Sequence, residues 1–378
     1  MDLPLLVTNP TNIRYLTGFV GASPKEREAY CLVMKSQIYL ITNPLYTEYA
    51  RNLVVQSRRG SNKPINQLSN KQINKELRKL ISRLGIKKLG FEENDLTISE
   101  YNEILKQVQD DESRIALVPT KGRVEEPRMI KREDEIENIR AAAKLADQCL
   151  DFILGKLKPG VTEREIAWEI ELFLRRTGSD LKKPRGEVQP ATLAFSPIVA
   201  FGKHTSQPHY QPSDVSLQRS DIILLDFGAR VNGYCSDMTR VVFVGHPDEE
   251  WQRAYHVVLR AQKSALDTIL RCIDTSKRTN KSINISGTLL DRTARKEIIQ
   301  MGFPPYPHSL GHGVGLGIHE APRLTINKNV TLKPNMIVTI EPAIYVEGTY
   351  GIRIEDLVLL KSDGIEILSQ SPKTLTIL

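Results

Sequence analysis

Apolar residues along this chain follow two different periods, and the change between them separates its regions. In residues 28–42, two short apolar runs flank the polar residues 35–37, which predicts a β-hairpin. Residues 71–84 place isoleucine and leucine at helical spacing, and Gly85 follows as a stop signal. Residues 88–91 are typical of a strand. This alternation predicts a small α/β domain in about the first 115 residues.

A break in the pattern at residues 118–123 separates this region from the rest, and Pro127 extends the irregular stretch. A long amphipathic helix is then expected over 131–152. Thr162 and Glu165 form a capping-box pattern that opens a second helix over 163–176. We therefore expect two domains, residues 1–121 and residues 122–378.

From about residue 190 the pattern changes to short apolar strands, with helical periodicity returning twice. We expect helices at 250–270 and 288–300. The expected strands are 198–200, 222–228, 234–244, 337–346 and 352–360. This order predicts an α+β second domain with a largely antiparallel sheet.

Composition excludes several classes of protein. The 378 residues carry a net charge of +7, but the charges alternate in sign, as in residues 131–135, which argues against a nucleic-acid partner. No uncharged apolar run is long enough to cross a membrane, and the first residues lack the regions of a secretory signal. The four cysteines lie far apart, which argues against zinc ribbons and disulfides. We expect a cytoplasmic protein with no membrane association.

The first candidate for chemistry is a hairpin around Asn232-Gly233, a strong turn signal. A register centred on this turn places Asp226 opposite Thr239, and Asp237 then points to the same side of the sheet. The two carboxylates become diagonal neighbours about 7 Å apart by Cα. They could instead be ordinary turn or strand-end residues, although an aspartate after four aliphatic residues is costly without a partner.

A second hairpin repeats this arrangement with glutamates. A turn centred on Gly348 places Glu341 opposite Glu355, and two like charges facing each other destabilise a strand pair. A bound cation would reverse the sign of this interaction. The alternative is a salt bridge to Arg353, which lies on the same face.

The glycine-rich segment 308–320 contains three of the chain's seven histidines, and His209 precedes the first aspartate. It matches neither the HExxH motif nor a phosphate-binding loop. Four carboxylates with an imidazole suit a pair of Mn, Co, Fe or Zn ions better than a structural zinc. Two such ions can share a hydroxide and polarise a carbonyl group.

These motifs together resemble the pita-bread metallopeptidases, and within them the Xaa-Pro dipeptidases (prolidases) and Xaa-Pro aminopeptidases. The catalytic motifs are LLDFGARVNGYCSDMTR (224–240), PHSLGHGVGLGIHEAP (307–322), IEPAIYV (340–346) and GIRIEDLV (351–358). Residues 12–19 resemble the start of a creatinase-like N-terminal domain, and residues 130–136 the start of the catalytic domain. The resemblance implies an α/β N-terminal domain followed by an α+β pita-bread domain with a largely antiparallel curved sheet.

The resemblance also implies a role for each site residue. Asp226 would bind one metal ion, Asp237 and Glu355 would bridge two, and His312 and Glu341 would complete the shell of the other. Catalytic roles fall to four residues: His209 and His319 at the substrate, Glu341 as proton acceptor, and Arg353 near the site. Tyr345 is expected nearby, and His308 in a supporting role.

The implied activity is hydrolysis of Xaa-Pro peptide bonds by a homodimer with two divalent ions per subunit, Mn or Co first and Zn or Fe as alternatives. The expected substrate is a peptide with proline in the second position, and specifically a dipeptide. One alternative is an aminopeptidase acting on longer Xaa-Pro peptides. Another is a non-catalytic relative that binds peptide or nucleic acid, although all five ligand positions are filled. Two segments, 42–46 and 271–287, depart from the family pattern.

Overall fold

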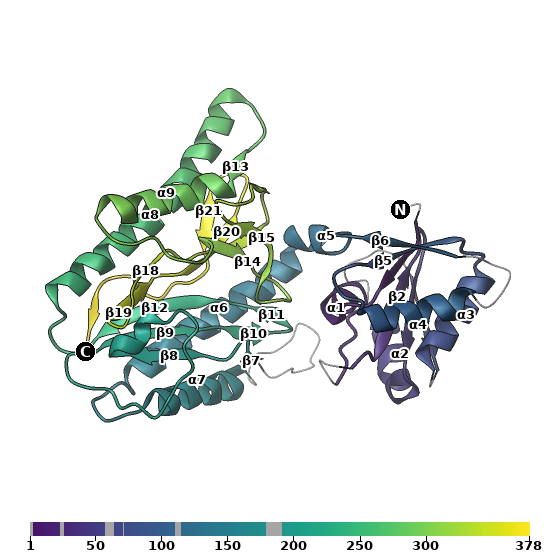
Figure 1. The fold of residues 1–378 in the computed structure, drawn as a ribbon, viewed down its shortest axis with the longest axis horizontal. Helices are drawn as coiled ribbons and strands as arrows, with labels where there is room; N and C mark the ends of the chain where they lie inside the picture. The colour runs from purple at the N-terminus through teal and green to yellow at the C-terminus, as the bar shows by residue number, and fades with distance from the viewer. Residues whose placement is uncertain (1–2, 23–25, 57–63, 71, 110–114, 179–190) are drawn as a thin grey trace. The chain divides into compact units, whose positions relative to one another are not determined.

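The computed structural model describes residues 3–22, 26–56, 64–70, 72–109, 115–178 and 191–378. It consists of two compact units, Met1–Arg128 and Met129–Leu378 (Figure 1). The expected boundary lay between residues 121 and 122. Within the described ranges, no helix combines the length and the apolar character that crossing a bilayer requires.

The first unit is built on a mixed sheet in the order β4-β3-β2-β1-β5-β6. Its strands are β1 (Leu5–Val7), β2 (Ala29–Val33), β3 (Ile38–Thr42), β4 (Ile65–Ser69), β5 (Lys88–Glu92) and β6 (Ala116–Thr120). Its helices are α1 (Pro10–Thr17), α2 (Thr47–Gln56), α3 (Ile73–Arg83), α4 (Ile98–Gln109) and α5 (Glu125–Met129), with a 3-10 turn at Pro44–Tyr46. The α/β prediction for this region is confirmed.

Local predictions in this unit were mostly correct. The hairpin of β2 and β3 forms with Val33 opposite Ile38. The predicted helix is α3, whose Leu77 and Leu80 pack into the core; Lys71, the first residue of that prediction, lies outside the described residues.

The expected break at 118–123 was wrong in part, because β6 continues through Pro119. A proline is tolerated there because β6 is an edge strand. The expected irregular stretch around Pro127 is the short helix α5.

Among the described residues of the second unit, four long helices follow the predicted periodicity. They are α6 (Glu133–Leu154), α7 (Glu163–Gly178), α8 (Glu249–Thr279) and α9 (Gly287–Gln300). The capping box at α7 is present: Glu165 Oε2 accepts from the Thr162 amide at 2.8 Å, and the Glu165 amide donates to Thr162 Oγ1 at 3.1 Å. Helix α8 extends beyond the expected end at residue 270, because Ile273 and Ser276 continue its buried face.

Two sheets form the centre of this unit, and nearly all of their strand pairs are antiparallel, as predicted. One has the order β22-β12-β9-β8 and the other the order β15-β14-β17-β20-β21, and the described part of the unit also contains three smaller sheets. The strands are β7 (Thr192–Leu193), β8 (Ile198–Phe201), β9 (Ile222–Phe227), β10 (Ala229–Val231), β11 (Tyr234–Cys235), β12 (Met238–Phe243), β13 (Ile285–Ser286), β14 (Gly311–Gly313), β15 (Glu320–Leu324), β16 (Thr331–Leu332), β17 (Ile337–Ile340), β18 (Ala343–Val346), β19 (Tyr350–Arg353), β20 (Asp356–Leu360), β21 (Ile365–Ile367) and β22 (Thr376–Ile377). A 3-10 turn covers Gly202–Ser206.

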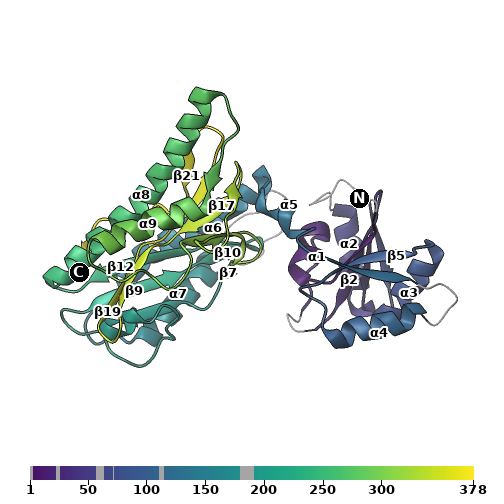
Figure 2. The same ribbon diagram turned by 45° about the horizontal axis from the view of Figure 1, so that its top comes forward.

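Helices cover both faces of the four-stranded sheet. Alternate residues of β9 point in opposite directions: Ile223 and Leu225 pack toward α6 and α7, whereas Ile222 and Leu224 pack toward α8. Helices α8 and α9 lie side by side in both ribbon views (Figure 1, Figure 2). The strands are therefore buried on both faces, and a polar side chain in their interior needs a specific partner.

Both predicted hairpin registers are confirmed. Asp226 lies opposite Thr239, as the Asn232-Gly233 turn requires. The register centred on Gly348 holds from Ala343 opposite Arg353 to Ile340 opposite Asp356.

The continuity of three predicted strands was wrong. Residues 234–244, 337–346 and 352–360 are each interrupted, between β11 and β12, β17 and β18, and β19 and β20. At each break the chain passes from one sheet to another. Asp237, Glu341 and Glu355 occupy these three breaks.

Candidate metal centre and active site

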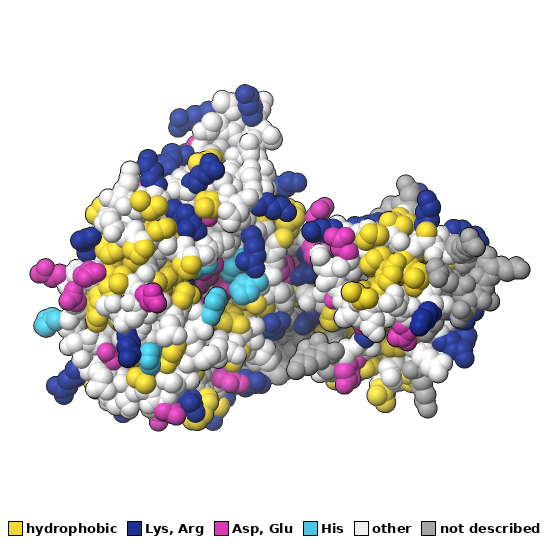
Figure 3. Space-filling view, viewed as in Figure 1, with side chains coloured by type: hydrophobic (Ala, Val, Ile, Leu, Met, Phe, Trp, Pro, Cys, Tyr) yellow, Lys and Arg dark blue, Asp and Glu magenta, His cyan; other side chains and the backbone are white. Residues whose placement is uncertain are grey.

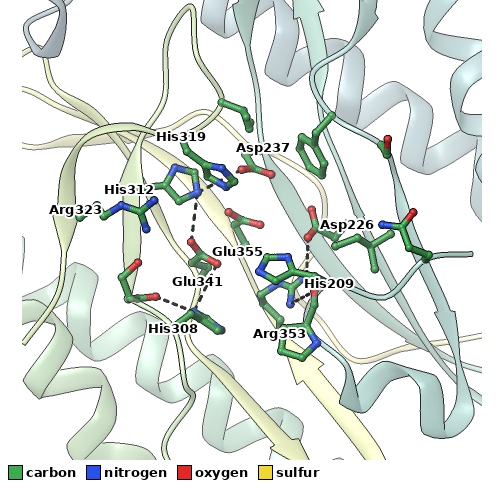
Figure 4. A pocket seen from close by; sticks show the side chains of 17 residues that line it. His209, Asp226, Asp237, His308, His312, His319, Arg323, Glu341, Arg353 and Glu355 are labelled. Carbon is green, nitrogen blue, oxygen red and sulfur yellow. Dashed lines mark hydrogen bonds and ion pairs between the residues drawn. The ribbon is translucent and has the colours of Figure 1, made fainter. Parts of the chain in front are cut away.

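The residues expected to bind metal or to act in catalysis all line one cavity of about 400 Å³ in the second unit, together with His308, whereas Tyr345 is not part of the lining. They are His209, Asp226, Asp237, His312, His319, Glu341, Arg353 and Glu355. Figure 3 shows histidine side chains close together on one face of this unit. In Figure 4, His312 and His319 lie on one side of the carboxylates, and His209 and Arg353 lie on the other.

The ligand atoms of Asp237, His312 and Glu355 all lie within 4.8 Å of one another. His312 Nε2 is 3.6 Å from Asp237 Oδ2 and 3.5 Å from Glu341 Oε1. These separations are longer than ordinary hydrogen bonds. The side chains thus converge on a common point without satisfying one another, as the ligands of a metal ion do.

The strand breaks explain how these side chains reach the cavity. A residue at a break is released from the strict alternation of a strand, so its side chain can turn toward a neighbouring sheet. His312 lies in β14 beside a bulge, where the register shifts between His312 and Gly313. Its neighbouring glycines are required by space: a Cβ on Gly311 would lie 1.9 Å from the Thr339 carbonyl oxygen, and one on Gly313 2.2 Å from that of Ala321.

Burial makes the four carboxylates costly as anions. Desolvation raises the pKa of Asp237 and of Glu341 well above the usual values, and the charge of Glu355 adds to both effects. Desolvation, with the charge of Asp226, raises the pKa of Glu355 to about 8. The pKa of Asp226 is raised by desolvation despite its contact with Arg353. A cation among these groups would favour their ionised forms.

Two further observations fit a bound cation. Asp226 Oδ1 is buried and has no hydrogen-bond partner among the described residues. Desolvation lowers the pKa of His312 to about 3, so this imidazole is neutral, which is the form that binds metal. Four carboxylates and one neutral imidazole form an oxygen-rich donor set that suits divalent ions of the Mn, Co, Fe or Zn type.

Two threonines that sequence reasoning missed hold the glutamates in place. Thr239 Oγ1 donates to Glu355 Oε2 at 2.7 Å. Thr339 Oγ1 lies 3.2 Å from Glu341 Oε1 and accepts from the His312 amide at 3.0 Å. A sequence signal was available, since each threonine stands two residues from a predicted ligand along the chain.

Arg353 is committed to partners inside the protein. It is buried, and its NH2 group donates to Asp226 Oδ2 at 2.5 Å. Its NH1 group donates to the Tyr345 hydroxyl at 2.5 Å, and its Nε to Thr239 Oγ1 at 2.9 Å. The sequence suggested that Arg353 forms a salt bridge with the facing glutamates. Arg353 does form an ion pair, but with Asp226 of the other hairpin and with neither glutamate.

Arg323 is a cavity residue that the sequence reasoning did not single out. It lies on β15 opposite His312, is exposed, and makes no hydrogen bond or ion pair with another residue in the described part of the chain. Its charge contributes to the lowered pKa of His319, after desolvation. The only available signal was its position next to the histidine motif. It is a cation at the cavity that can meet an anionic group.

Three further histidines lie around the carboxylates and are not assigned as metal ligands. The His319 ring meets His312 edge-on with centroids 4.5 Å apart. His308 Nε2 is 3.3 Å from the Tyr345 hydroxyl, and burial lowers the pKa of His308 to about 4. His209 follows Pro208 and lines the cavity opposite His319 (Figure 4). His209 and His319 can donate to a group bound between them.

Comparison with known proteins agrees with this picture. Residues 137–362 match the model of metallopeptidase family M24, and residues 4–130 match that of the creatinase/prolidase N-terminal domain. Uncharacterized peptidase YqhT of Bacillus subtilis is 34% identical over 99% of this chain and 95% of its own length.

Solved structures are similar over the whole length. The Xaa-Pro dipeptidase from Bacillus anthracis aligns with a TM-score of 0.85 at 34% identity, covering 99% of this chain and 95% of that one. The X-Pro aminopeptidase from Thermotoga maritima gives 0.82 at 30% identity, covering 100% and 97%. The prolidase from Pyrococcus horikoshii gives 0.81 at 30% identity, covering 99% and 95%.

Proposed function

Because this chain belongs to metallopeptidase family M24, a family of metal-dependent peptidases, we propose that it is an Xaa-Pro dipeptidase that uses two divalent metal ions. The observation that carries the proposal is the cavity itself, in which a full set of acidic ligands and a free arginine lie together. The similarity to structures named as a dipeptidase and a prolidase supports it. We further propose Mn or Co as the metal and a cytoplasmic homodimer as the active form.

Five residues would hold the two ions: Asp226, Asp237, His312, Glu341 and Glu355. When bound, the ions would supply an activated water and polarise the scissile carbonyl group. Glu341, which Thr339 contacts, is the carboxylate proposed to accept a proton from the attacking water. His209 and His319 would donate to the oxygen that gains charge in the transition state.

Recognition of a dipeptide needs a cation for the proline carboxylate. Arg353 lines the cavity, but its three nitrogens have partners within the protein. Arg323 lines the same cavity with no such partner, so we assign the carboxylate to Arg323. The apolar side chains of Phe195 and Ile318 also line the cavity and offer a surface for the proline ring.

The test compares three substrates on the Mn- and Co-loaded protein: an Xaa-Pro dipeptide, its C-terminal amide, and an Xaa-Pro-Xaa tripeptide. Loss of a charge-assisted hydrogen bond of about 1.5–3 kcal/mol should lower kcat/KM for the amide roughly ten- to a hundredfold. Arg323→Ala should remove this discrimination, and Arg323→Lys should retain part of it. Equal rates on dipeptide and tripeptide in the wild type would contradict a dipeptidase.

That contrary outcome would support the second proposal, an aminopeptidase for longer Xaa-Pro peptides. The similarity to the X-Pro aminopeptidase from Thermotoga maritima favours it. No hydrolysis of any Xaa-Pro substrate by the metal-loaded protein would contradict both and leave a peptide- or nucleic-acid-binding relative.

A further inference from the structure

We propose that Glu163, which lies outside the cavity lining, is a positioning residue that fixes the loop of residues 201–213 and thereby directs His209 toward the substrate. The proposal rests on the proposed function, in which His209 contacts the substrate. Glu163 is in the first turn of α7 and is fully buried. His209 lies in the loop and lines the cavity.

One carboxylate oxygen of Glu163 holds the beginning of the loop. Oε1 accepts from the backbone amide of Phe201 at 2.9 Å and lies 2.8 Å from His204 Nδ1. The His204 ring also stacks on Tyr210, with centroids 4.5 Å apart.

The other oxygen holds the end of the loop. Oε2 accepts from the Ser213 amide at 3.1 Å and from the Ser213 hydroxyl at 2.7 Å. The Tyr210 hydroxyl is 2.9 Å from Oε2 and the same distance from Ser213 Oγ. A carboxylate offers about four lone-pair sites, so the loop uses the full accepting capacity of Glu163.

The middle of the loop is anchored on its other side by β19. The Gly351 amide donates to Thr205 Oγ1 at 2.7 Å, and a Cβ on Gly351 would lie 2.0 Å from the Thr205 carbonyl oxygen. Arg353 NH1 is 3.5 Å from the Pro208 carbonyl oxygen. The loop is thus held between α7 and the strand that carries Arg353, and His209 follows Pro208 directly.

Helix capping does not account for Glu163. The Thr162–Glu165 pair caps α7, the Glu163 and Arg164 amides donate to backbone carbonyl oxygens of Val215 and Ser213, and the Glu163 carboxylate takes no part in either. Glu165 is exposed. Every group around the Glu163 carboxylate donates to it, so an amide in its place would turn an NH2 group toward donors. Glu163→Gln should therefore disturb the loop despite its matching shape.

The first experiment is hydrogen–deuterium exchange on the full-length wild type, Glu163→Gln and the control Glu165→Ala. Glu163→Gln should speed exchange at the Phe201 and Ser213 amides, and Glu165→Ala should affect only the first turn of α7. Ser213→Ala removes one donor and is the milder variant if Glu163→Gln does not fold; it should speed exchange at the loop less. Unchanged exchange of loop amides in the folded variants would overturn the proposal.

The second experiment is a double-mutant cycle with His209→Ala on Xaa-Pro substrate. Glu163→Gln should lower kcat/KM by up to about 10²-fold, mainly through kcat, with metal content unchanged. Added to His209→Ala, it should lower kcat/KM little further, because its effect passes through His209. Additive losses, or an equal loss in Glu165→Ala, would overturn the role in positioning.

The two proposals fail in different ways. If the metal-loaded wild type cleaves no Xaa-Pro peptide, the proposed function is wrong, and loop exchange alone then decides whether Glu163 fixes the loop. If the wild type is active and loop exchange is unchanged in Glu163→Gln, the proposed function stands and this inference is wrong.

Discussion

Glu355 and Asp356 are neighbours in the chain, but their side chains lie in opposite environments. Glu355 lines the cavity together with three other carboxylates, those of Asp226, Asp237 and Glu341. Asp356 lies behind the cavity, where it accepts from Arg240 NH2 at 2.8 Å and from the Lys373 ammonium group. Both carboxyl groups are fully buried or nearly so.

This difference shows that buried negative charge is paired with cations behind the cavity and is mostly unpaired within it. Behind the cavity, Arg240 also donates to the Glu355 and Ser371 carbonyl oxygens, so cation and acceptors are matched. Within the cavity, Arg353 is bonded to Asp226 alone among the four carboxylates, and burial raises the pKa of each of the four. The imbalance is confined to one side of the strands, which indicates a site that a cation completes.

The largest effect is expected from changing the unbalanced side. Asp237→Asn removes a charge that the two proposed cations would share, so one or both ions and nearly all activity should be lost. We expect a drop in kcat/KM above about 10²-fold, since loss of even an outer-shell partner can cost that much. Metal analysis together with an Xaa-Pro assay measures both. Full activity after exhaustive chelation of the wild type would contradict metal dependence.

A substitution behind the cavity, where Arg240 pairs with Asp356, should lower the stability of the fold and not act on metal binding. Arg240→Met leaves Asp356 with Lys373 as its remaining cation and leaves several buried carbonyl oxygens without their donor, so the free energy of unfolding should fall by about 3 kcal/mol. Urea unfolding measures this. Arg260→Met is the matched control, because its ion pair with Glu297 is exposed and should contribute about 1 kcal/mol or less. Equal losses in both variants would contradict the comparison.

His319→Ala tests whether His319 acts on the substrate and not as a metal ligand. This variant should keep its metal, because only His312 is assigned as a ligand. It should lose turnover by about 10²–10³-fold through the missing donor to the developing oxyanion. Metal loss in His319→Ala with metal retention in His312→Ala would show that the two histidines have exchanged roles.

The smallest effect is the pH dependence of the metal-free protein. The pKa of Glu355 is raised to about 8 in the folded state, so folding binds protons between its usual value near 4.5 and about 8. Stability of the chelated protein should therefore fall as pH rises through this window. Bound metal should offset the loss, so the Tm difference between loaded and chelated protein should widen by several degrees from pH 5 to pH 8. A constant difference would contradict the raised pKa.

Local signals predicted much of the site. The Asn232-Gly233 turn was enough to place Asp226 opposite Thr239, because a two-residue turn determines the register of its strands. The same reasoning around Gly348 gave the pairing that brings Glu341 and Glu355 near each other. Register is a local property, and the two hairpins could be treated separately.

Contacts between distant segments could not be predicted in this way. The partner of Arg353 is Asp226, which lies 127 residues away on the other hairpin. The strand breaks at the ligands depend on a switch between sheets, which the apolar pattern of one strand does not reveal. Glu163 appeared only as a residue inside a capping box, since its partners begin 38 residues further along the chain.

The division of the carboxylates between two hairpins also bears on the order of folding events. Each hairpin closes locally, but Thr239 and Glu355, which join them, are 116 residues apart. Contacts of such long range form late, after the entropy of closing the intervening chain has been lost. Metal would then bind after the transition state for folding. Added Mn or Co should slow unfolding while leaving the refolding rate nearly unchanged, so the metal would extend the lifetime of the folded chain without speeding its formation.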